Sequence, residues 1–242
     1  MRRLIRLLLN VYSCEKEKYF WNPEKPSSYD LQQLVNNLDF IDVKEFKLQG
    51  RYPKISYPLE KQILEKIFKQ DKKISDLLKE KGKAIYYRTT GGRYFKVITN
   101  YSTGSTKEKP IFFEKNIADV IGAILSSNLF FWFYQIYSNN LDLKSYEIES
   151  FTVPGAKFTD SKINEIEKLY DAYLKDIENN ASVRQTTRYA NINSFKEYKI
   201  GKSKKIIDKI DDVICPLYGL NEEEINFIKN YEIEYRLSDD SE

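Results

Sequence analysis

Histidine is absent from this chain of 242 residues, and cysteine occurs only twice. Ser-His-Asp and Cys-His catalysis both need an imidazole, as do zinc sites that contain histidine, so these classes are excluded. Cys14 and Cys215 are too few for a cysteine-only metal cluster. They lie far apart in sequence, so we expect two isolated, reduced thiols.

Signatures of cofactor binding are also missing. There is no P-loop and no dinucleotide fingerprint, since Gly91-Gly92 alone is too little. Amino-methyltransferases need a cofactor-binding glycine turn and an Asn/Asp-Pro-Pro-aromatic loop. The nearest match, Asn22-Pro23-Glu24-Lys25, lacks the second proline and the aromatic ring. The sequence therefore predicts no catalytic residue, no metal site and no cofactor bound by this chain.

One nuclease-like pattern is present. Asp42 followed by Glu45-Phe46-Lys47 has the letters of a metal-dependent nuclease, in which an acidic residue precedes an acid-x-Lys triplet on strands. Such triplets arise by chance in a chain rich in lysine and glutamate. A nuclease is therefore only a third hypothesis, to be tested by magnesium-dependent cleavage and its loss in Lys47→Ala.

Charge is unevenly distributed. The whole chain has 39 basic and 36 acidic side chains, whereas residues 221–242 have two basic and eight acidic ones, so the first 220 residues carry a net charge of +9. This excess favours a polyanionic partner, although many lysine-rich proteins bind nothing charged. The basic and apolar start, MRRLIRLLLNVYS, is too short for a signal peptide and lacks a cleavage site, so we expect it to belong to the fold.

The stretch KAIYYRTTGGRYFKVITNYS (83–102) is the strongest structural signal. Two arms rich in β-branched and aromatic residues meet at Gly91-Gly92, which predicts a β-hairpin with a two-residue turn. The predicted register pairs Thr90 with Arg93, Arg88 with Phe95 and Tyr86 with Val97. Arg88 and Arg93 would then share one face, where guanidinium groups suit phosphates or guanine edges in a major groove. An ordinary surface hairpin with solvated arginines is the alternative.

The remaining pattern predicts an α+β fold with a mixed or antiparallel sheet, a central hairpin and a buried helix, followed by a C-terminal helical subregion. Apolar spacing predicts helices in 29–40, 58–81, 163–177, 206–217 and from 222 onward, and strands in 44–55, 111–114 and up to Val153. Residues 179–193 are polar and are expected to be loose. We expect an α+β target-recognition domain over 1–157 and a helical spacer or docking region over 158–242.

Asn116 to Tyr137 is the most apolar stretch and is about long enough to span a bilayer. Asp119, Ser126, Ser127, Asn128 and Gln135 interrupt it, and its flanks lack the basic asymmetry of an anchor. The interpretation we favour is a buried helix, or two helices broken at Ser126-Ser127-Asn128, with no membrane partner.

Three phrases resemble a known family. IYYRTTGGRYFKVI (85–98), SSNLFFWFYQIYSNNLDLKSYEIESFTVP (126–154) and SKKIIDKIDDVICPLYGLNEEEINFIKNYEIEYR (203–236) are similar to the C-terminal target-recognition region of type IIG-like restriction-modification adenine-specific DNA methyltransferases. In that family a separate N-terminal domain binds S-adenosylmethionine and methylates the flipped adenine. The resemblance implies a cytoplasmic phage-defence protein whose recognition part, not catalytic alone, binds double-stranded DNA beside a methyltransferase domain in cis or in trans.

Two segments are candidates for DNA contact. The hairpin supplies guanidinium, hydroxyl and amide groups, and the loop after the buried helix lies in the segment that the family shares. For Asn139-Asn140, a plain turn is an equal alternative. The predicted DNA-binding residues are Arg88, Thr89, Thr90, Arg93, Tyr94, Lys96, Asn100, Asn139, Asn140 and Lys144.

A protein-interaction module is the competing hypothesis. In this alternative the apolar stripes on the predicted C-terminal helices dock onto a methyltransferase or restriction subunit. The chain then has no useful DNA affinity of its own. Retention of duplex DNA in a mobility assay at low salt distinguishes the two.

Overall fold

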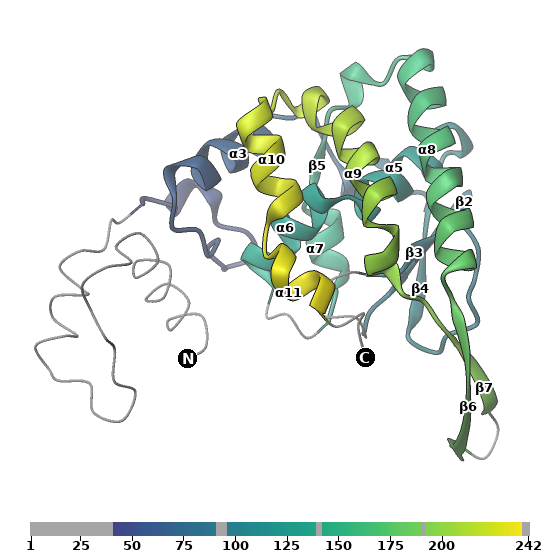
Figure 1. Cartoon of the computed structure of the whole chain (residues 1–242). Coiled ribbons are helices and arrows are strands. Elements are labelled where there is room, and N and C mark those ends of the chain that lie inside the picture. The colour runs from purple at the N-terminus through teal and green to yellow at the C-terminus, as the bar shows by residue number, and fades with distance from the viewer. Residues whose placement is uncertain (1–40, 91–95, 139–141, 190–191, 239–242) are drawn as a thin grey trace, which may run out of the picture.

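The computed structural model describes residues 41–90, 96–138, 142–189 and 192–238, and it has the predicted α+β architecture (Figure 1). Helices dominate, and the described strands form one three-stranded and two two-stranded sheets, all antiparallel. The helical elements are η1 (Lys44–Phe46), α3 (Pro58–Phe68), α4 (Ile74–Leu77), α5 (Lys115–Ser126), α6 (Asn128–Tyr137), α7 (Ser145–Glu149), η2 (Gly155–Lys157), α8 (Asp160–Asn179), η3 (Ile200–Ser203), α9 (Lys204–Ile214), η4 (Cys215–Tyr218), α10 (Glu222–Asn230) and α11 (Ile233–Ser238). The strands are β1 (Lys72–Lys73), β2 (Lys83–Arg88), β3 (Ile98–Thr99), β4 (Glu108–Phe113), β5 (Thr152–Val153), β6 (Ser182–Tyr189) and β7 (Ile192–Glu197).

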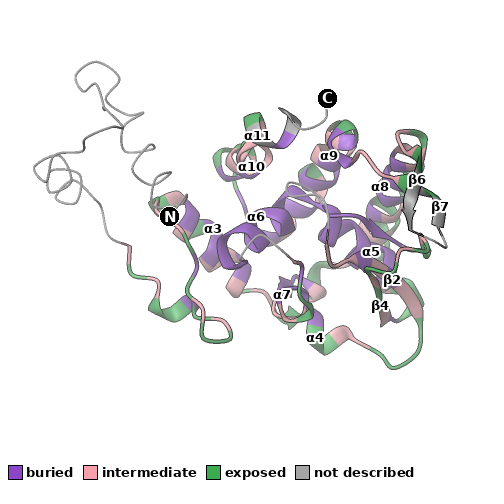
Figure 2. Ribbon diagram, turned by 90° about the horizontal axis from the view of Figure 1, so that it is seen from below, coloured by how far each residue is buried: buried purple, intermediate pink, exposed green. Residues whose placement is uncertain are grey.

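Helices α5 and α6 form the centre of the molecule. Every residue of α6 is buried, including Trp132, and α5 is buried from Ala118 to Ser126, as the purple colouring in Figure 2 shows. Ser127 separates the two helices and caps α6 by accepting a hydrogen bond from the Phe130 N–H (3.1 Å). The prediction of two buried helices broken at Ser126-Ser127-Asn128 is therefore confirmed.

Among the described residues, no single helix has both the length and the apolar character needed to cross a bilayer. The pair α5 and α6 meets that test only when taken together, with a bend of 63° between them.

The predicted hairpin exists, but its register is shifted by two residues. Tyr86 pairs with Thr99 and Tyr87 with Ile98, whereas we predicted Tyr86 opposite Val97. The Arg88 N–H donates to the Val97 carbonyl (3.1 Å), which continues the shifted register beyond Tyr87. A shift of two residues keeps the same side chains on each face. The Gly91-Gly92 turn lies outside the described residues.

Strand β2 is the central strand, because β4 pairs along its other side from Lys83↔Phe113 to Arg88↔Glu108. The predicted strand at 111–114 is thus confirmed as part of β4. Ile85 and Tyr87 point into the core beside α5, while Tyr86 and Arg88 are half-buried on the opposite face. The sheet therefore packs one face on α5 and leaves the other partly open.

Four local predictions need correction. The predicted strand at 44–55 is η1 followed by an isolated bridge between Leu48 and Arg51, because Gln49 and Gly50 turn the chain with positive φ. The predicted helix at 58–81 is interrupted after Phe68, where β1 pairs with β5. Helix α7 lies in a stretch that we expected to be loop and strand, although the strand does end at Val153. The predicted helix at 29–40 lies outside the described residues.

The fourth correction concerns residues 179–193, which we expected to be loose. Strands β6 and β7 form a two-stranded antiparallel sheet there, and it projects away from the helices in Figure 1. The C-terminal region is therefore not purely helical.

The C-terminal helices bury their apolar stripes inside this chain. Ile166, Tyr170 and Tyr173 of α8 are fully buried, and α8 packs on α5 and α9. Helix α9 likewise buries Ile207, Ile210 and Ile214. These stripes are consequently used in intramolecular packing, and they are not open surfaces for another subunit.

Two predicted helix ends are confirmed in this region. Gly219 closes η4 in the left-handed conformation (φ 80°), and Asn221 with Glu224 forms the capping box of α10. The cysteine prediction is tested at one position, where Cys215 is a buried free thiol, whereas Cys14 lies outside the described residues.

Gly122 of α5 lies directly against Tyr170 of α8. A Cβ atom at this position would lie 2.5 Å from Cζ of Tyr170. Tyr170 is fully buried and stacked on Tyr173, so it has no room to retreat. We expect Gly122→Ala to lower the free energy of unfolding by about 1 to 3 kcal/mol in urea titrations. Helix propensity alone predicts a gain of about 1 kcal/mol, so a more stable variant would contradict this packing.

Asp211 ties α9 to the break between α5 and α6. Its buried carboxylate accepts hydrogen bonds from the N–H groups of Asn128 (3.0 Å) and Leu129 (3.1 Å), at the beginning of α6. The Asn128 side-chain amide also donates to it (2.6 Å). A negative group at a helix N-terminus is favourable, so this carboxylate fixes the position of α6.

Burial raises the pKa of Asp211 to about 6, although hydrogen bonds from Asn128 and Leu129 favour the charged form. A carboxyl whose pKa is raised on folding contributes stability that is full below about pH 4 and is lost as the pH rises through about 6. Asparagine does not titrate. We therefore expect the stability of the wild type relative to Asp211→Asn to fall by up to about 3 kcal/mol between pH 4 and 7 in urea unfolding. A difference independent of pH would contradict this assignment.

Candidate nucleic-acid interface

The two predicted DNA-contacting segments meet at the end of β2. The Leu143 N–H, in the segment that follows residues 139–141, donates to the Thr89 carbonyl at 2.8 Å. The Thr89 N–H and hydroxyl both donate to the Lys107 carbonyl, at 2.8 and 3.0 Å. Segments distant in sequence therefore converge beside Arg88. Four predicted residues (Arg93, Tyr94, Asn139 and Asn140) lie outside the described residues.

Arg88 carries the most informative side chain at this point. It is half-buried, and its Nε is buried without a hydrogen-bond acceptor among the described residues. Glu108 lies opposite it on β4, but that carboxylate accepts from Ser102 Oγ (2.8 Å) and from the Thr103 N–H (2.9 Å). A buried donor without an acceptor costs about 1 to 3 kcal/mol, so a rearrangement that gave this N–H an acceptor would be favourable.

Thr89, Thr90 and Lys144 lie in the same neighbourhood. Both threonines are half-buried, and Lys144 is exposed at the beginning of α7, where its backbone N–H donates to the Glu147 carboxylate (2.8 Å). That backbone contact leaves the ammonium group of Lys144 on the surface. Their role in DNA binding stays a prediction.

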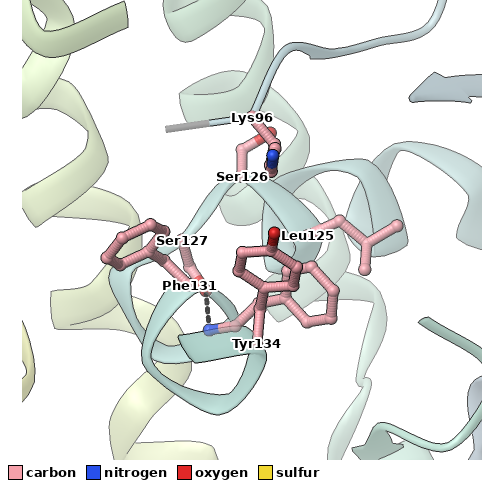
Figure 3. Close-up of a pocket in the computed structure, with 7 residues that line it drawn as sticks. Lys96, Leu125, Ser126, Ser127, Phe131 and Tyr134 are labelled. Carbon is pink, nitrogen blue, oxygen red and sulfur yellow. Dashed lines mark hydrogen bonds between the residues drawn. The ribbon is translucent and has the colours of Figure 1, made fainter. Parts of the chain in front are cut away.

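Lys96 points into the protein. It is 8% exposed, and its Nζ lies 5.1 Å from the ring centroid of Tyr134. Burial lowers the pKa of Lys96, while the carboxylates of Asp142 and Glu147 act in the opposite direction. Lys96 borders a small hollow of about 10 Å³, room for about one water molecule. Figure 3 shows the side chains around it. The hollow is lined by Lys96, Leu125, Ser126, Ser127, Phe130, Phe131 and Tyr134.

Asn100 is also engaged within the chain. Its amide donates to Asp119 (3.0 Å), which is paired with Lys83 as well. A contact from Lys96 or Asn100 to a base would require these side chains to exchange an internal partner for a DNA partner. The Nε of Arg88 has no such partner within the described part of the chain.

The residues of the nuclease-like pattern, Asp42 and Glu45-Phe46-Lys47, do not have the geometry that a metal-dependent nuclease requires. Phe46 is buried in η1, which is a 3-10 turn, whereas the pattern needs strands. The Asp42 carboxylate accepts from the Lys44 N–H (3.0 Å), and the Lys47 ammonium lies over the ring of Tyr52. Within the part of the chain that the structure describes, no group of three or more acidic or cysteine side chains is placed to hold a metal ion.

Sequence reasoning missed the β6–β7 sheet. The available signal was the β-branched and aromatic content of SVRQTTRYANINSFKE, in which Val183, Thr187 and Tyr189 occupy alternate positions. The polar composition concealed this signal, because the sheet projects from the molecule and does not need a continuous apolar face. Arg184, Gln185, Ser194 and Lys196 are exposed on its described part.

No protein-family model, curated protein or solved structure matches this chain. The resemblance to target-recognition regions therefore depends on the three sequence phrases alone. The convergence of segments beside Arg88 is a structural observation that does not depend on this resemblance.

Proposed function

We propose that this chain is a sequence-specific recognition domain for double-stranded DNA, which works beside a separate restriction-modification adenine methyltransferase and is not catalytic alone. The observation that carries the proposal is the half-buried Arg88, whose Nε lacks an acceptor among the described residues at the point where the hairpin and the 138–144 segment converge. In this proposal S-adenosylmethionine belongs to the methyltransferase partner.

The chemistry of the converging segments suits a duplex. Guanidinium groups bind guanine O6 and N7 bidentately, whereas asparagine binds adenine N6 and N7. The hairpin sequence supplies Arg88 and Arg93, and the neighbouring segment supplies Asn139 and Asn140. Lys144 and Lys107 are exposed nearby and are suited to phosphates. Base readout and backbone positioning would thus come from one surface.

The interaction-module alternative receives less support. A docking face for another protein usually contains contiguous exposed apolar surface. Among the described residues, the exposed large hydrophobic side chains are Tyr52, Tyr57 and Val183, and Val183 lies on the projecting β6–β7 sheet. The C-terminal stripes are already buried against α5 and α6.

A mobility assay with a pool of random duplexes tests the proposal. The purified chain should retain duplex at low salt, and the logarithm of the binding constant should fall linearly with the logarithm of salt concentration. A single-stranded pool of the same length is the control, and it should bind more weakly. No retention of duplex at low salt would refute the proposed function.

A further inference from the structure

The β6–β7 sheet is a narrow projecting arm. Ser182↔Glu197 and Gln185↔Ser194 are paired at its base, and a register shift follows between Gln185 and Tyr189. At about 3.3 Å per residue, the eight residues of β6 extend roughly 26 Å. Both views show the arm next to the β2–β4 sheet, and in Figure 1 it extends beyond the ends of β3 and β4. A two-stranded ribbon of this kind has the width that a major groove admits.

The base of the arm is anchored by Glu178 at the end of α8. Its carboxylate accepts hydrogen bonds from the hydroxyl groups of Tyr101 (2.6 Å) and Tyr198 (2.7 Å), and it pairs with Lys196. Burial alone raises the pKa of Glu178, but the bonds from Lys196 and the two tyrosines outweigh it and lower that pKa. The arm is therefore attached in one orientation to the segment after β3.

A run of lysines follows the arm directly. Residues 196–205, KEYKIGKSKK, contain five lysines and one glutamate. Ile200 and Ser203 are buried and fix the backbone of η3, whereas Lys202 and Lys205 are exposed and Lys199 is half-buried. Lys202 and Lys205 are therefore exposed directly after the arm, and Lys199 is partly exposed beside them.

Three of the nearby carboxylates are already occupied. Glu197 pairs with Arg184, Asp208 pairs with Lys204 and accepts from Asn128, and Glu178 is held as described above. Lys199, Lys202 and Lys205 form no salt bridge within the described residues. A lysine cluster is commonly a solvated face, and α11, which packs on η3, carries the exposed Glu234. The three carboxylates named above, however, face other partners.

We propose that the arm and this lysine cluster form a second DNA-contacting surface, in which β6–β7 enters a groove and Lys199, Lys202 and Lys205 contact the phosphates beside it. This inference depends on the proposed function, because it assigns a second contact to the same duplex. In this proposal the surface beside Arg88 contacts bases, and the lysine cluster adds affinity that does not depend on the DNA sequence.

The test is a salt titration of duplex binding by the full chain with Lys199, Lys202 and Lys205 replaced by alanine. Each phosphate contact contributes about 0.9 to the slope of log K against log salt, so the slope should fall by about 2.7. Affinity should decrease for all duplex sequences alike. The matched control is Lys69→Ala, Lys72→Ala and Lys81→Ala, which removes the same charge from three exposed positions and should leave the slope close to that of the wild type.

A second variant addresses the arm itself. Joining Gln185 to Ser194 through Asn-Gly removes residues 186–193 but keeps the paired base. Circular dichroism should show an unchanged helix content, and duplex affinity should drop. An unchanged slope in the triple variant, or equal slopes in the triple variant and its control, would overturn the inference while leaving the proposed function intact. Absence of duplex binding by the wild type would refute both.

Discussion

Replacing both Arg88 and Arg93 with alanine should weaken binding to the preferred duplex by about 1 to 3 kcal/mol for each bidentate interaction that is removed, which is about 5- to 150-fold per arginine. The expectation for Arg88 is structural, because its Nε has no acceptor among the described residues. The expectation for Arg93 comes from the sequence. If the two side chains bind bases, discrimination between duplexes should also decrease. Fluorescence anisotropy with labelled duplexes at fixed salt measures both effects.

The control for this variant is the double change Lys69→Ala and Lys72→Ala, which removes two charges at exposed positions. Its affinity should differ from the wild type by much less than that of the arginine variant. Single Arg88→Ala separates the structural expectation from the sequence-based one. Unchanged binding and unchanged discrimination in the double arginine variant would remove the hairpin from the interface.

Replacing Asp211 with alanine should lower the free energy of unfolding by about 3 to 5 kcal/mol at pH 7. The change removes the acceptor of three N–H donors, which are the backbone of Asn128 and Leu129 and the Asn128 amide, and of the Cys215 thiol (3.7 Å). Each buried donor left without a partner costs about 1 to 3 kcal/mol. The destabilisation is partly offset, because a fully buried carboxylate is itself costly to desolvate. Urea unfolding followed by circular dichroism gives the difference.

The adjacent Asp212 provides the control. It is exposed and pairs with Lys229 on the surface, so Asp212→Ala should change the free energy of unfolding by about 1 kcal/mol or less. If the two alanine variants were equally stable, Asp211 would not be the group that fixes the beginning of α6.

Local sequence signals predicted the features that depend on neighbouring residues. The break at Ser126-Ser127-Asn128 was predictable because a serine hydroxyl can cap a following helix, and Ser127 does so for α6. The capping box of Asn221 and Glu224 and the left-handed Gly219 were predictable for the same reason. The hairpin arms were recognisable from their β-branched and aromatic composition.

Features that depend on distant contacts were not predictable. Nothing near Asp211 in sequence indicates that it accepts from Asn128, and nothing near Thr89 indicates its bonds to Lys107 and Leu143. Helix α7 and the arm at 182–197 formed where polar composition suggested loops. In α7 the Lys144 N–H donates to Glu147 and Ile148 is buried, whereas the arm is defined by the pairing of β6 with β7.

The candidate site also combines features that the local sequence predicted with features that depend on distant contacts. Sequence patterns selected the two segments that the Leu143–Thr89 hydrogen bond brings together, but they did not show that Lys96 points inward to Tyr134 or that Asn100 bonds to Asp119. Side-chain direction depends on which face of the sheet packs on α5. The lysine cluster gains its proposed role from its position after a projecting arm, which the sequence did not predict.

Selection of duplexes from a fully random pool by the purified chain, followed by sequencing of the retained fraction, tests the central claim most directly. We expect successive rounds at moderate salt to enrich one defined sequence, and the Arg88→Ala variant to enrich a more degenerate one. A pool that stays random after several rounds, or a chain that retains no duplex at all, would contradict the assignment of this protein as a sequence-specific DNA recognition domain.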